Sequence, residues 1–313
     1  MKAAIVYSAG KLPEYGDFIE PLVDADHVMI NVKAAAVSQL VKSRTAGTHY
    51  SSRMHYPFIA GIDGTGYLSH GEPVYFLTFG TPWGSMAERT LAQVNHIVPL
   101  PATLDPVLAA ALANPGMSSW AALTRRAQLR TGETVLINGA TGTSGSLAIR
   151  IARHLGAGKI IATGRNVDAL DKLRAQGADI TLPLEALPTN LPALMAEGID
   201  VVLDYLWGPS ALDIMTAAAA GAEKVVRFVQ IGSLSGQTLS LHSKLLRSSG
   251  LTLMGSGLGS LANADLIASI GEMLQAAALQ DFSIPFQRRP LSDVNTAWEE
   301  DNSRCRTVFV VDR

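Results

Sequence analysis

The sequence has little cysteine and little charge. Cys305 is the single cysteine of the 313 residues, which excludes an internal disulfide framework and favours a reducing compartment. Charged residues make up 17% of the chain and the formal net charge is −2, so the electrostatics give no reason to expect nucleic acid or an anionic membrane as a partner. Long apolar runs are missing too: none approaches the roughly 18–20 residues that span a bilayer. The first residues, "MKAAIVYSAG", indicate a strand rather than a signal peptide, so we expect a cytoplasmic protein.

What the chain does contain is apolar residues, 48% of the total, over a length that suits two domains. In residues 1–100, short alternating or β-branched runs are separated by Gly, Pro, Asp and Ser, which predicts an irregular β-rich domain. Residues 105–131 favour a helix that is interrupted at Pro115-Gly116.

From Glu133 onward, strand-like and helix-like segments alternate. Apolar runs such as "TVLINGA", "KIIATG" and "IDVVLDYL" are separated by helical stretches such as "SLAIRIARHLG" and "VDALDKLRAQG". Near-continuous apolar strands that alternate with helices are typical of a parallel sheet covered on both faces. We therefore predict an α/β fold with a doubly wound parallel sheet, a further strand at 251–257, a helix at 264–279 and a closing strand in "RTVFVVDR".

The segment "NGATGTSGS" lies between the first strand and the first helix of this sheet. Glycines there permit a tight turn and let the backbone approach a pyrophosphate, while the helix N-terminus offers N–H groups and the positive end of its dipole. A glycine-rich turn without a ligand is the alternative, which the strand–turn–helix setting disfavours. A P-loop is excluded because no Gly-Lys-Ser or Gly-Lys-Thr follows. The candidate nucleotide-binding residues are Gly142, Thr143, Ser144 and Gly145.

The end of the next strand indicates which nucleotide binds. An NAD site usually carries an acidic residue about 20 residues further on, which holds the ribose 2′-hydroxyl. Here the strand ends in Gly164, Arg165 and Asn166, and no acid follows until Asp168. An arginine pairs with a 2′-phosphate that a carboxylate would repel, so the sequence favours NADP(H). A solvated surface charge is the alternative interpretation of Arg165.

At this point the chain resembles the medium-chain dehydrogenases/reductases, nearest the zinc-free quinone oxidoreductase branch. The order of segments carries the resemblance, because short-chain reductases place their glycine turn near the N-terminus, whereas here it lies in the middle of the chain. The segments that match, besides the glycine turn, are "MKAAIVYSAG", "PFIAGIDGTG" (57–66), "GSMAERT" (84–90) and "AAALANPGMSSWAAL" (109–123).

The resemblance implies a GroES-like substrate domain built from both ends of the chain around a Rossmann domain, with the active site in the cleft between them. The expected boundaries are 1–115 for the substrate domain, 116–257 for the NADP(H)-binding domain and 258–313 for the returning segment. In that segment, Cys305-Arg306 replaces the Gly-Lys that usually precedes the last strand of the family.

The zinc ligands of related alcohol dehydrogenases have no counterparts in this sequence. Ser38 stands near the position of the first cysteine, Gly61-Ile62-Asp63 replaces Gly-His-Glu, and residues 114–117 offer no thiolate. His49, His55 and Asp63 are close in sequence, but their spacing matches no standard site and solvated or locally bonded side chains explain them better. We therefore predict no metal, which leaves hydride delivery to an already electrophilic acceptor, a quinone or a carbonyl-conjugated alkene.

The resemblance also implies residues of the active site. Tyr50 would donate a hydrogen bond to the substrate oxygen, and Ser118 stands where the family has a threonine that fixes the nicotinamide carboxamide. A structural tyrosine and a helix cap near Ser119 are the respective alternatives. For Asp204, a turn-forming role competes with a place at the ligand-binding end of its strand. The other residues expected around the cofactor are Ser38, Asn114, Tyr205, Ile231 and Gly232.

The predicted function is reduction of a quinone or an α,β-unsaturated carbonyl compound by NADPH. The alternatives are a nucleotide-binding sensor or interaction protein with little turnover, and an alcohol dehydrogenase of the zinc type that has lost its metal ligands. Because the strand at 251–257 is expected at an uncharged sheet edge, we also predict a homodimer joined through that edge.

Overall fold

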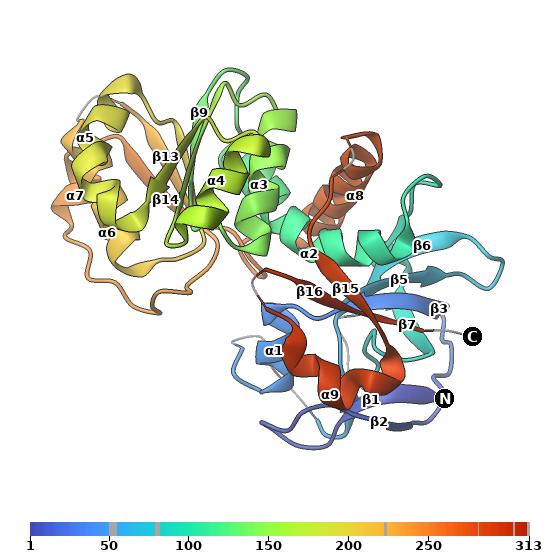
Figure 1. Ribbon diagram of the computed structural model, residues 1–313. Helices are drawn as coiled ribbons and strands as arrows, with labels where there is room; N and C mark the ends of the chain where they lie inside the picture. Colours follow the sequence, from blue (N-terminus) through green and yellow to red (C-terminus); the bar gives the residue numbers. More distant parts are fainter. Residues whose placement is uncertain (50–54, 79–81, 222–223, 281, 303, 312–313) are drawn as a thin grey trace. The chain divides into compact units, whose positions relative to one another are not determined.

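The computed structural model describes residues 1–49, 55–78, 82–221, 224–280, 282–302 and 304–311. It divides into two compact units, one formed by Met1–Asn114 with Ile267–Arg313 and the other by Pro115–Leu266 (Figure 1). Among the described residues, no helix combines the length and the apolar character required to cross a membrane.

The first unit contains two sheets made of short strands. A three-stranded antiparallel sheet has the order β2-β1-β4 and comprises β1 (Lys2–Val6), β2 (Glu14–Asp17) and β4 (Phe58–Ile59). A seven-stranded sheet has the order β15-β16-β3-β5-β6-β8, with β7 paired to β3. Its strands are β3 (His27–Ala36), β5 (Asp63–Tyr67), β6 (Pro73–Leu77), β7 (Arg89–Gln93), β8 (Ile97–Pro99), β15 (Phe286–Pro290) and β16 (Arg306–Val310).

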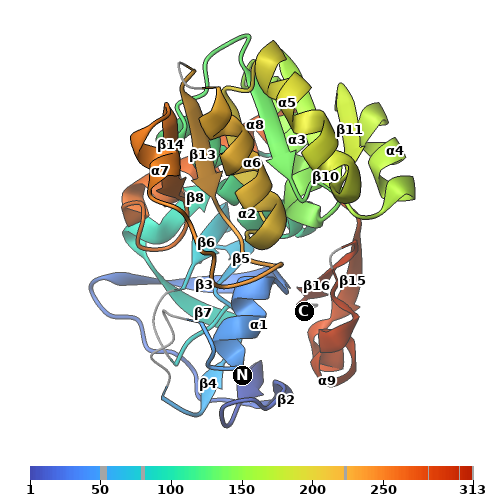
Figure 2. The same cartoon turned by 90° about the vertical axis from the view of Figure 1, so that its left-hand side faces the viewer.

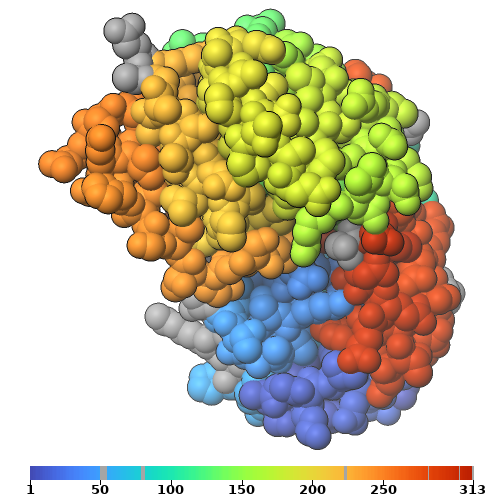
Figure 3. Space-filling model, turned by 60° about the vertical axis from the view of Figure 1, so that its left-hand side comes forward, coloured from blue at the N-terminus to red at the C-terminus, as the bar shows by residue number. Residues whose placement is uncertain are grey.

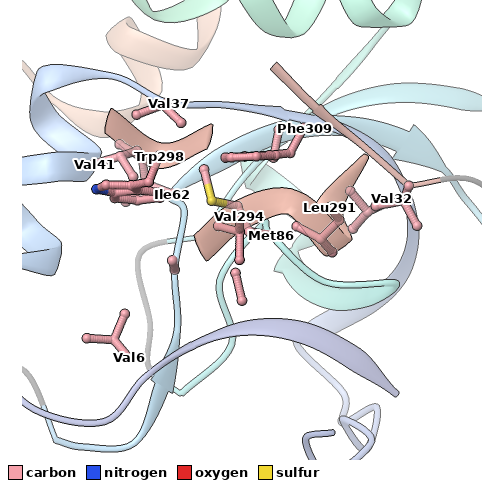
Figure 4. Packing of buried hydrophobic residues seen from close by; sticks show 14 of the residues in the cluster. Val6, Val32, Val37, Val41, Ile62, Met86, Leu291, Val294, Trp298 and Phe309 are labelled. Atoms are coloured by element: carbon pink, nitrogen blue, oxygen red, sulfur yellow. The ribbon is translucent and has the colours of Figure 1, made fainter. Parts of the chain in front are cut away.

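Both ends of the chain contribute to one core in this unit. Phe309 of β16 and Trp298, near the short helix α9 (Val294–Ala297), lie with Val37, Ile62 and Met86 in a single buried cluster (Figure 4). The antiparallel pairing of β16 with β3 joins the two chain ends directly. The β-rich domain built from both ends is therefore confirmed.

The second unit is a parallel six-stranded sheet with the order β11-β10-β9-β12-β13-β14. Most residues of its central strands are buried, as the apolar runs predict. Helices α3 and α4 lie on one side of the sheet and α5 and α6 on the other (Figure 1), which confirms the doubly wound fold. The strands are β9 (Thr134–Asn138), β10 (Lys159–Gly164), β11 (Ile180–Pro183), β12 (Val201–Asp204), β13 (Val226–Gln230) and β14 (Leu251–Gly255), and the helices are α3 (Thr143–His154), α4 (Val167–Ala175), α5 (Leu187–Glu197) and α6 (Gly208–Ala220).

Strand β14 forms one edge of this sheet and pairs with β13 (Figure 2). The stretch between these two strands includes the short helix α7 (Lys244–Arg247), and most of it is exposed, with Leu234 68% accessible to solvent. In Figure 3 it is the orange surface of this unit.

The predicted interruption at Pro115-Gly116 is wrong. Helix α2 (Pro106–Ala121) continues through Pro115 and passes into a π-helical turn, Ala122–Arg126. Proline has no N–H to offer to the carbonyl four residues earlier, that of Ala111. The buried guanidinium of Arg306 donates to that carbonyl instead, at 3.4 Å, so its hydrogen bond is replaced from outside the helix. After Gly255, helix α8 (Asn263–Gln280) begins one residue before the predicted helix.

Candidate functional site

The glycine-rich turn connects the end of β9 to the first turn of α3. Gly139 has a φ of +90°, a conformation that glycine adopts without strain. The N–H of Ala140 donates to the carbonyl of Thr163 at 2.7 Å, which ties the turn to β10. A Cβ at Gly145 would lie 2.5 Å from the Gly139 carbonyl oxygen and 2.7 Å from the Ala140 Cα, so only glycine lets the helix begin so close to the turn.

Gly142 has the opposite surroundings. Its φ is −85°, and an added Cβ would meet only the Gly139 carbonyl oxygen, at 3.9 Å. Gly142 is the N-cap of α3, and as a glycine it has no side chain to cap the helix. Thr143 and Ser144 lie in the first turn. Open space at a helix N-terminus suits an anion, because the first N–H groups of a helix lack intrahelical acceptors and the dipole favours negative charge. The turn therefore has the shape and polarity that a pyrophosphate requires.

The last residue of β10 and the residues that follow it have different environments. A Cβ at Gly164 would come within 2.4 Å of the Thr141 Cγ2, so this glycine accommodates the turn. Asn166 is the N-cap of α4, and its Oδ1 accepts from the N–H of Ala169 at 2.8 Å. Arg165 is exposed beside them, and Asp168 lies in the first turn of α4.

A buried polar network joins the ends of three neighbouring strands. The Asn138 amide donates to Asp204 Oδ1 at 2.8 Å and to Ser210 Oγ at 3.0 Å, while Thr163 Oγ1 donates to Asn138 Oδ1 at 2.9 Å. Asp204 also accepts from the backbone N–H groups that follow it, including that of Trp207, whose φ is +60°. Burial raises the pKa of Asp204. The structure thus gives this carboxylate the turn-forming role, and the network fixes the strand ends below the glycine turn.

Three predicted residues come together at the ends of β12 and β13. The N–H groups of Ile231 and Gly232 both donate to the Asp204 carbonyl, at 2.8 and 3.1 Å. A Cβ at Gly232 would lie 2.6 Å from the Tyr205 carbonyl oxygen, so glycine is required for this approach. Burial raises the pKa of Tyr205 to about 12, and its hydroxyl lies 2.8 Å from Ser119 Oγ. Tyr205 is therefore a neutral hydrogen-bonding group at any physiological pH.

The expectation of a helix cap at Ser118 or Ser119 is wrong. Both residues lie inside α2, because the helix continues through Pro115. The Ser118 hydroxyl donates to the Pro115 carbonyl at 2.8 Å and also has a hydrogen bond with the Tyr205 hydroxyl, so one of its two oxygen lone pairs remains for a ligand.

Of the predicted residues that remain, Ser38 and Asn114 belong to the first unit. Tyr50 lies outside the described residues. Ser38 is buried as the N-cap of helix α1 (Gln39–Thr45), and its Oγ accepts from the N–H of Val41 at 3.1 Å. Asn114 is a partly buried residue of α2.

Asp63 and His49 have surroundings that the sequence did not indicate. The Asp63 carboxylate is buried and accepts from the Tyr75 hydroxyl at 2.9 Å. Burial raises its pKa to about 6, against the opposing effects of Tyr75 and Arg306. The pKa of His49 is lowered, mainly by burial and to a smaller extent by the positive charge of Arg44. In the part of the chain that the structure describes, no group of three or more His, Cys, Asp or Glu side chains is placed to hold a metal ion.

Sequence reasoning missed Asn138 and Thr163. Both are polar residues at or near the ends of apolar strands. That signal becomes interpretable only once the neighbouring strands are known, because the two side chains bond to each other across the sheet.

Comparison with known proteins places these features in a family. A family model described as zinc-binding dehydrogenase matches residues 145–277. The probable NADPH-dependent quinone reductase tdiC of Emericella nidulans is 26% identical over 99% of this chain and 100% of its own length. The quinone oxidoreductase of Mus musculus is 31% identical over 72% of each chain. The solved quinone oxidoreductase of Thermus thermophilus, described together with its NADPH complex, aligns with a TM-score of 0.81 and 25% identity, over 99% of this chain and 100% of that one.

Proposed function

Because this chain belongs to the quinone oxidoreductase branch of the medium-chain dehydrogenase/reductase family, we propose that it reduces a quinone or an α,β-unsaturated carbonyl compound with NADPH and without a metal ion. It is an oxidoreductase and its cofactor is NADP(H). The observation that carries the proposal is the turn between β9 and α3, where the space at Gly142 lies open at a helix N-terminus.

The residues of the second unit fit the parts of this cofactor, which supplies the hydride when bound. The turn from Gly142 to Gly145 binds the pyrophosphate. Arg165, exposed at the end of β10, pairs with the 2′-phosphate, and no carboxylate stands at that strand end to repel it.

The nicotinamide end is oriented by residues that follow β12 and β13. Tyr205 follows the last residue of β12, and the N–H groups of Ile231 and Gly232 donate to the Asp204 carbonyl, so the three residues lie at one strand end. The Ser118 hydroxyl donates to Pro115 and has a hydrogen bond with the Tyr205 hydroxyl, so the remaining lone pair of its oxygen would accept from the carboxamide N–H.

The donor set supports the proposal that no metal ion is required. At the positions of the family's zinc ligands this chain offers the Ser38 hydroxyl and the Asp63 carboxylate. Ser38 Oγ accepts from the N–H of Val41, and Asp63 Oδ2 accepts from the Tyr75 hydroxyl. Zinc sites in proteins use cysteine thiolates or histidine imidazoles, alone or together with acidic side chains, and neither Ser38 nor Asp63 is a thiolate or an imidazole. An acceptor that is electrophilic without a Lewis acid is therefore the suitable substrate.

The test is oxidation of NADPH and of NADH by the purified protein with a panel of quinones and enones. We expect turnover with NADPH, a lower kcat/KM with NADH, and rates that prolonged dialysis against a chelator leaves unchanged. Tight NADPH binding without turnover on any acceptor would favour the sensor or interaction protein instead, and loss of activity on chelation would contradict the metal-free reaction.

A further inference from the structure

Arg44 is a half-buried cation without an anionic partner in the described chain. Its Nε is shielded from solvent and has no hydrogen-bond partner, and no carboxylate of the described residues lies within ion-pair distance. A guanidinium nitrogen that has lost its water and gained no acceptor costs free energy. The fold therefore maintains an unfavourable arrangement at this position.

Other buried or half-buried arginines of the described chain have acceptors, including Arg89, whose Nε is also unpartnered but whose Nη2 pairs with Glu20. Arg126 Nε donates to the Gly255 carbonyl at 2.7 Å, and Arg227 pairs with Glu133 at 2.6 Å. Arg306 donates to the Ala111 carbonyl and is attracted by Asp301 and Asp63. Arg44 differs from all four, although the same rule of satisfied buried polar groups applies to it.

Helix α1 holds Arg44 in place. Ser38 caps the helix, Val41 lies in the buried core shown in Figure 4, and Lys42 Nζ donates to the Asp301 carbonyl at 2.7 Å. Arg44 lies in the last turn, where the helix dipole favours a cation. The dipole accounts for a positive charge there, but it provides no acceptor for the shielded Nε.

The surroundings of the guanidinium leave one side of it open. Nη1 and Nη2 are not among the buried atoms that lack partners, and no group of the described residues accepts from them, so they reach solvent. His49 is nearby, and because its pKa is lowered it is largely neutral at pH 7 and adds no second charge. The result is a single fixed positive group with a planar fork of donors, a geometry that matches a carboxylate or sulfonate.

We propose that Arg44 binds an acidic group, a carboxylate or a sulfonate, carried by the electron acceptor. The inference rests on the proposed function in taking the bound acid to be the acceptor. An anionic ligand supplies the missing acceptor for the guanidinium, whereas a neutral ester of the same ring system does not. Arg44 would thus be the residue that makes the enzyme prefer acidic acceptors.

Binding without turnover tests the proposal independently of the catalytic function. Anthraquinone-2-carboxylate and its methyl ester are titrated calorimetrically into the protein without NADPH. We expect Arg44→Met to weaken binding of the carboxylate by about 10- to 100-fold and to leave the ester unchanged, as for loss of a charge-assisted hydrogen bond. Arg44→Lys should restore part of the affinity. Lys11→Met removes an exposed cation of the same unit and is the matched control, with no expected change.

Several outcomes would overturn the assignment. Unchanged affinity for the carboxylate in Arg44→Met, or equal losses for carboxylate and ester, would show that Arg44 does not recognise the acid. Weaker binding of NADPH to the same variant would assign the arginine to a cofactor phosphate. A chain that binds the carboxylate through Arg44 but reduces no quinone would contradict the proposed function alone.

A stability measurement separates this role from a structural one. If Arg44 is held for a ligand, Arg44→Met should unfold at the same or a higher urea concentration than the wild type, because a partly dehydrated charge is removed. A clear loss of stability would identify Arg44 as a structural residue and overturn the proposal.

Discussion

Asp63 is a carboxylate in surroundings that oppose its ionisation. It is 2% exposed, its Oδ2 accepts from Tyr75, and its Oδ1 has no hydrogen-bond partner. Burial outweighs the favourable effects of Tyr75 and Arg306 and raises its pKa from 3.8 to about 6. The folded protein therefore holds a proton on Asp63 over a pH range in which the unfolded chain has lost it.

The sign of the effect on stability follows from this difference. Between about pH 4 and pH 6 the folded state binds more protons than the unfolded state, so the free energy of unfolding falls as the pH rises through that window. We expect Asp63→Asn to remove this fall. The stability of this variant relative to wild type should be greater at pH 8 than at pH 4, by on the order of 2–3 kcal/mol, because the pKa differs by about two units between the folded and unfolded states.

Urea unfolding of both proteins at the two pH values measures the difference. Tyr75→Phe is the control in the opposite direction: it removes the donor to Asp63, so it should destabilise the protein more at pH 8 than at pH 4. The same relative stability of Asp63→Asn at both pH values would contradict the assignment.

Single residues differ in how far the sequence predicts them. Gly142 and Gly145 are identified from their spacing, because the demands of a tight turn are local. Asn138 and Thr163 have no such signal, since their hydrogen bonds exist only when β9 and β10 align in parallel with these two residues opposite each other.

At the scale of elements, the strand–turn–helix unit allows a matched pair of glycine substitutions. Gly142→Val places a side chain in open space, so we expect a folded protein that has lost NADPH affinity because the valine occupies the position of the pyrophosphate. Gly145→Val forces atoms against the Gly139 carbonyl and the Ala140 Cα, so it should lower stability as well. Equilibrium binding of NADPH and thermal unfolding of the two variants are the measurements. A Gly142→Val protein that retains its affinity would move the nucleotide site elsewhere.

Helix α2 shows why an element boundary can escape prediction. Proline normally ends a helix, and nothing near Pro115 indicates otherwise. The compensation comes from Arg306, which lies in the returning segment and reaches the Ala111 carbonyl. A hydrogen bond between residues so far apart in sequence cannot be found from local patterns.

At the scale of the whole molecule, the parallel sheet could be predicted from the sequence pattern itself. Apolar strands that alternate with helices permit few other arrangements. The sheet order of the first unit had no such basis, because short antiparallel strands give no local indication of their partners. That both chain ends share one β-rich domain followed from the resemblance, and the pairing of β16 with β3 is its physical expression.

Assembly is the remaining property at this scale, and we propose a homodimer joined through β14. The strand "LTLMG" carries no charged residue and forms an edge of the parallel sheet. The Gly250 carbonyl accepts from the Val226 N–H, and the Ser256 N–H donates to the Gln230 carbonyl. The backbone N–H and carbonyl groups of the even-numbered residues of β14 therefore face β13. By the alternation of a strand, the N–H and carbonyl of Leu253 face the open edge. Two such edges related by a two-fold axis would pair with each other.

The side of the strand on which a proline removes an N–H therefore distinguishes assembly from folding. Leu253→Pro takes a donor from the open edge and leaves the hydrogen bonds to β13 in place, so we expect a folded monomer. Met254→Pro removes an N–H that faces β13 and should instead destabilise the sheet itself. Light scattering at micromolar concentration and thermal unfolding measure the two effects. Either a wild-type monomer at that concentration or a folded, dimeric Leu253→Pro protein would contradict pairing through β14, because in both cases the edge donors of this strand would not be holding two copies together.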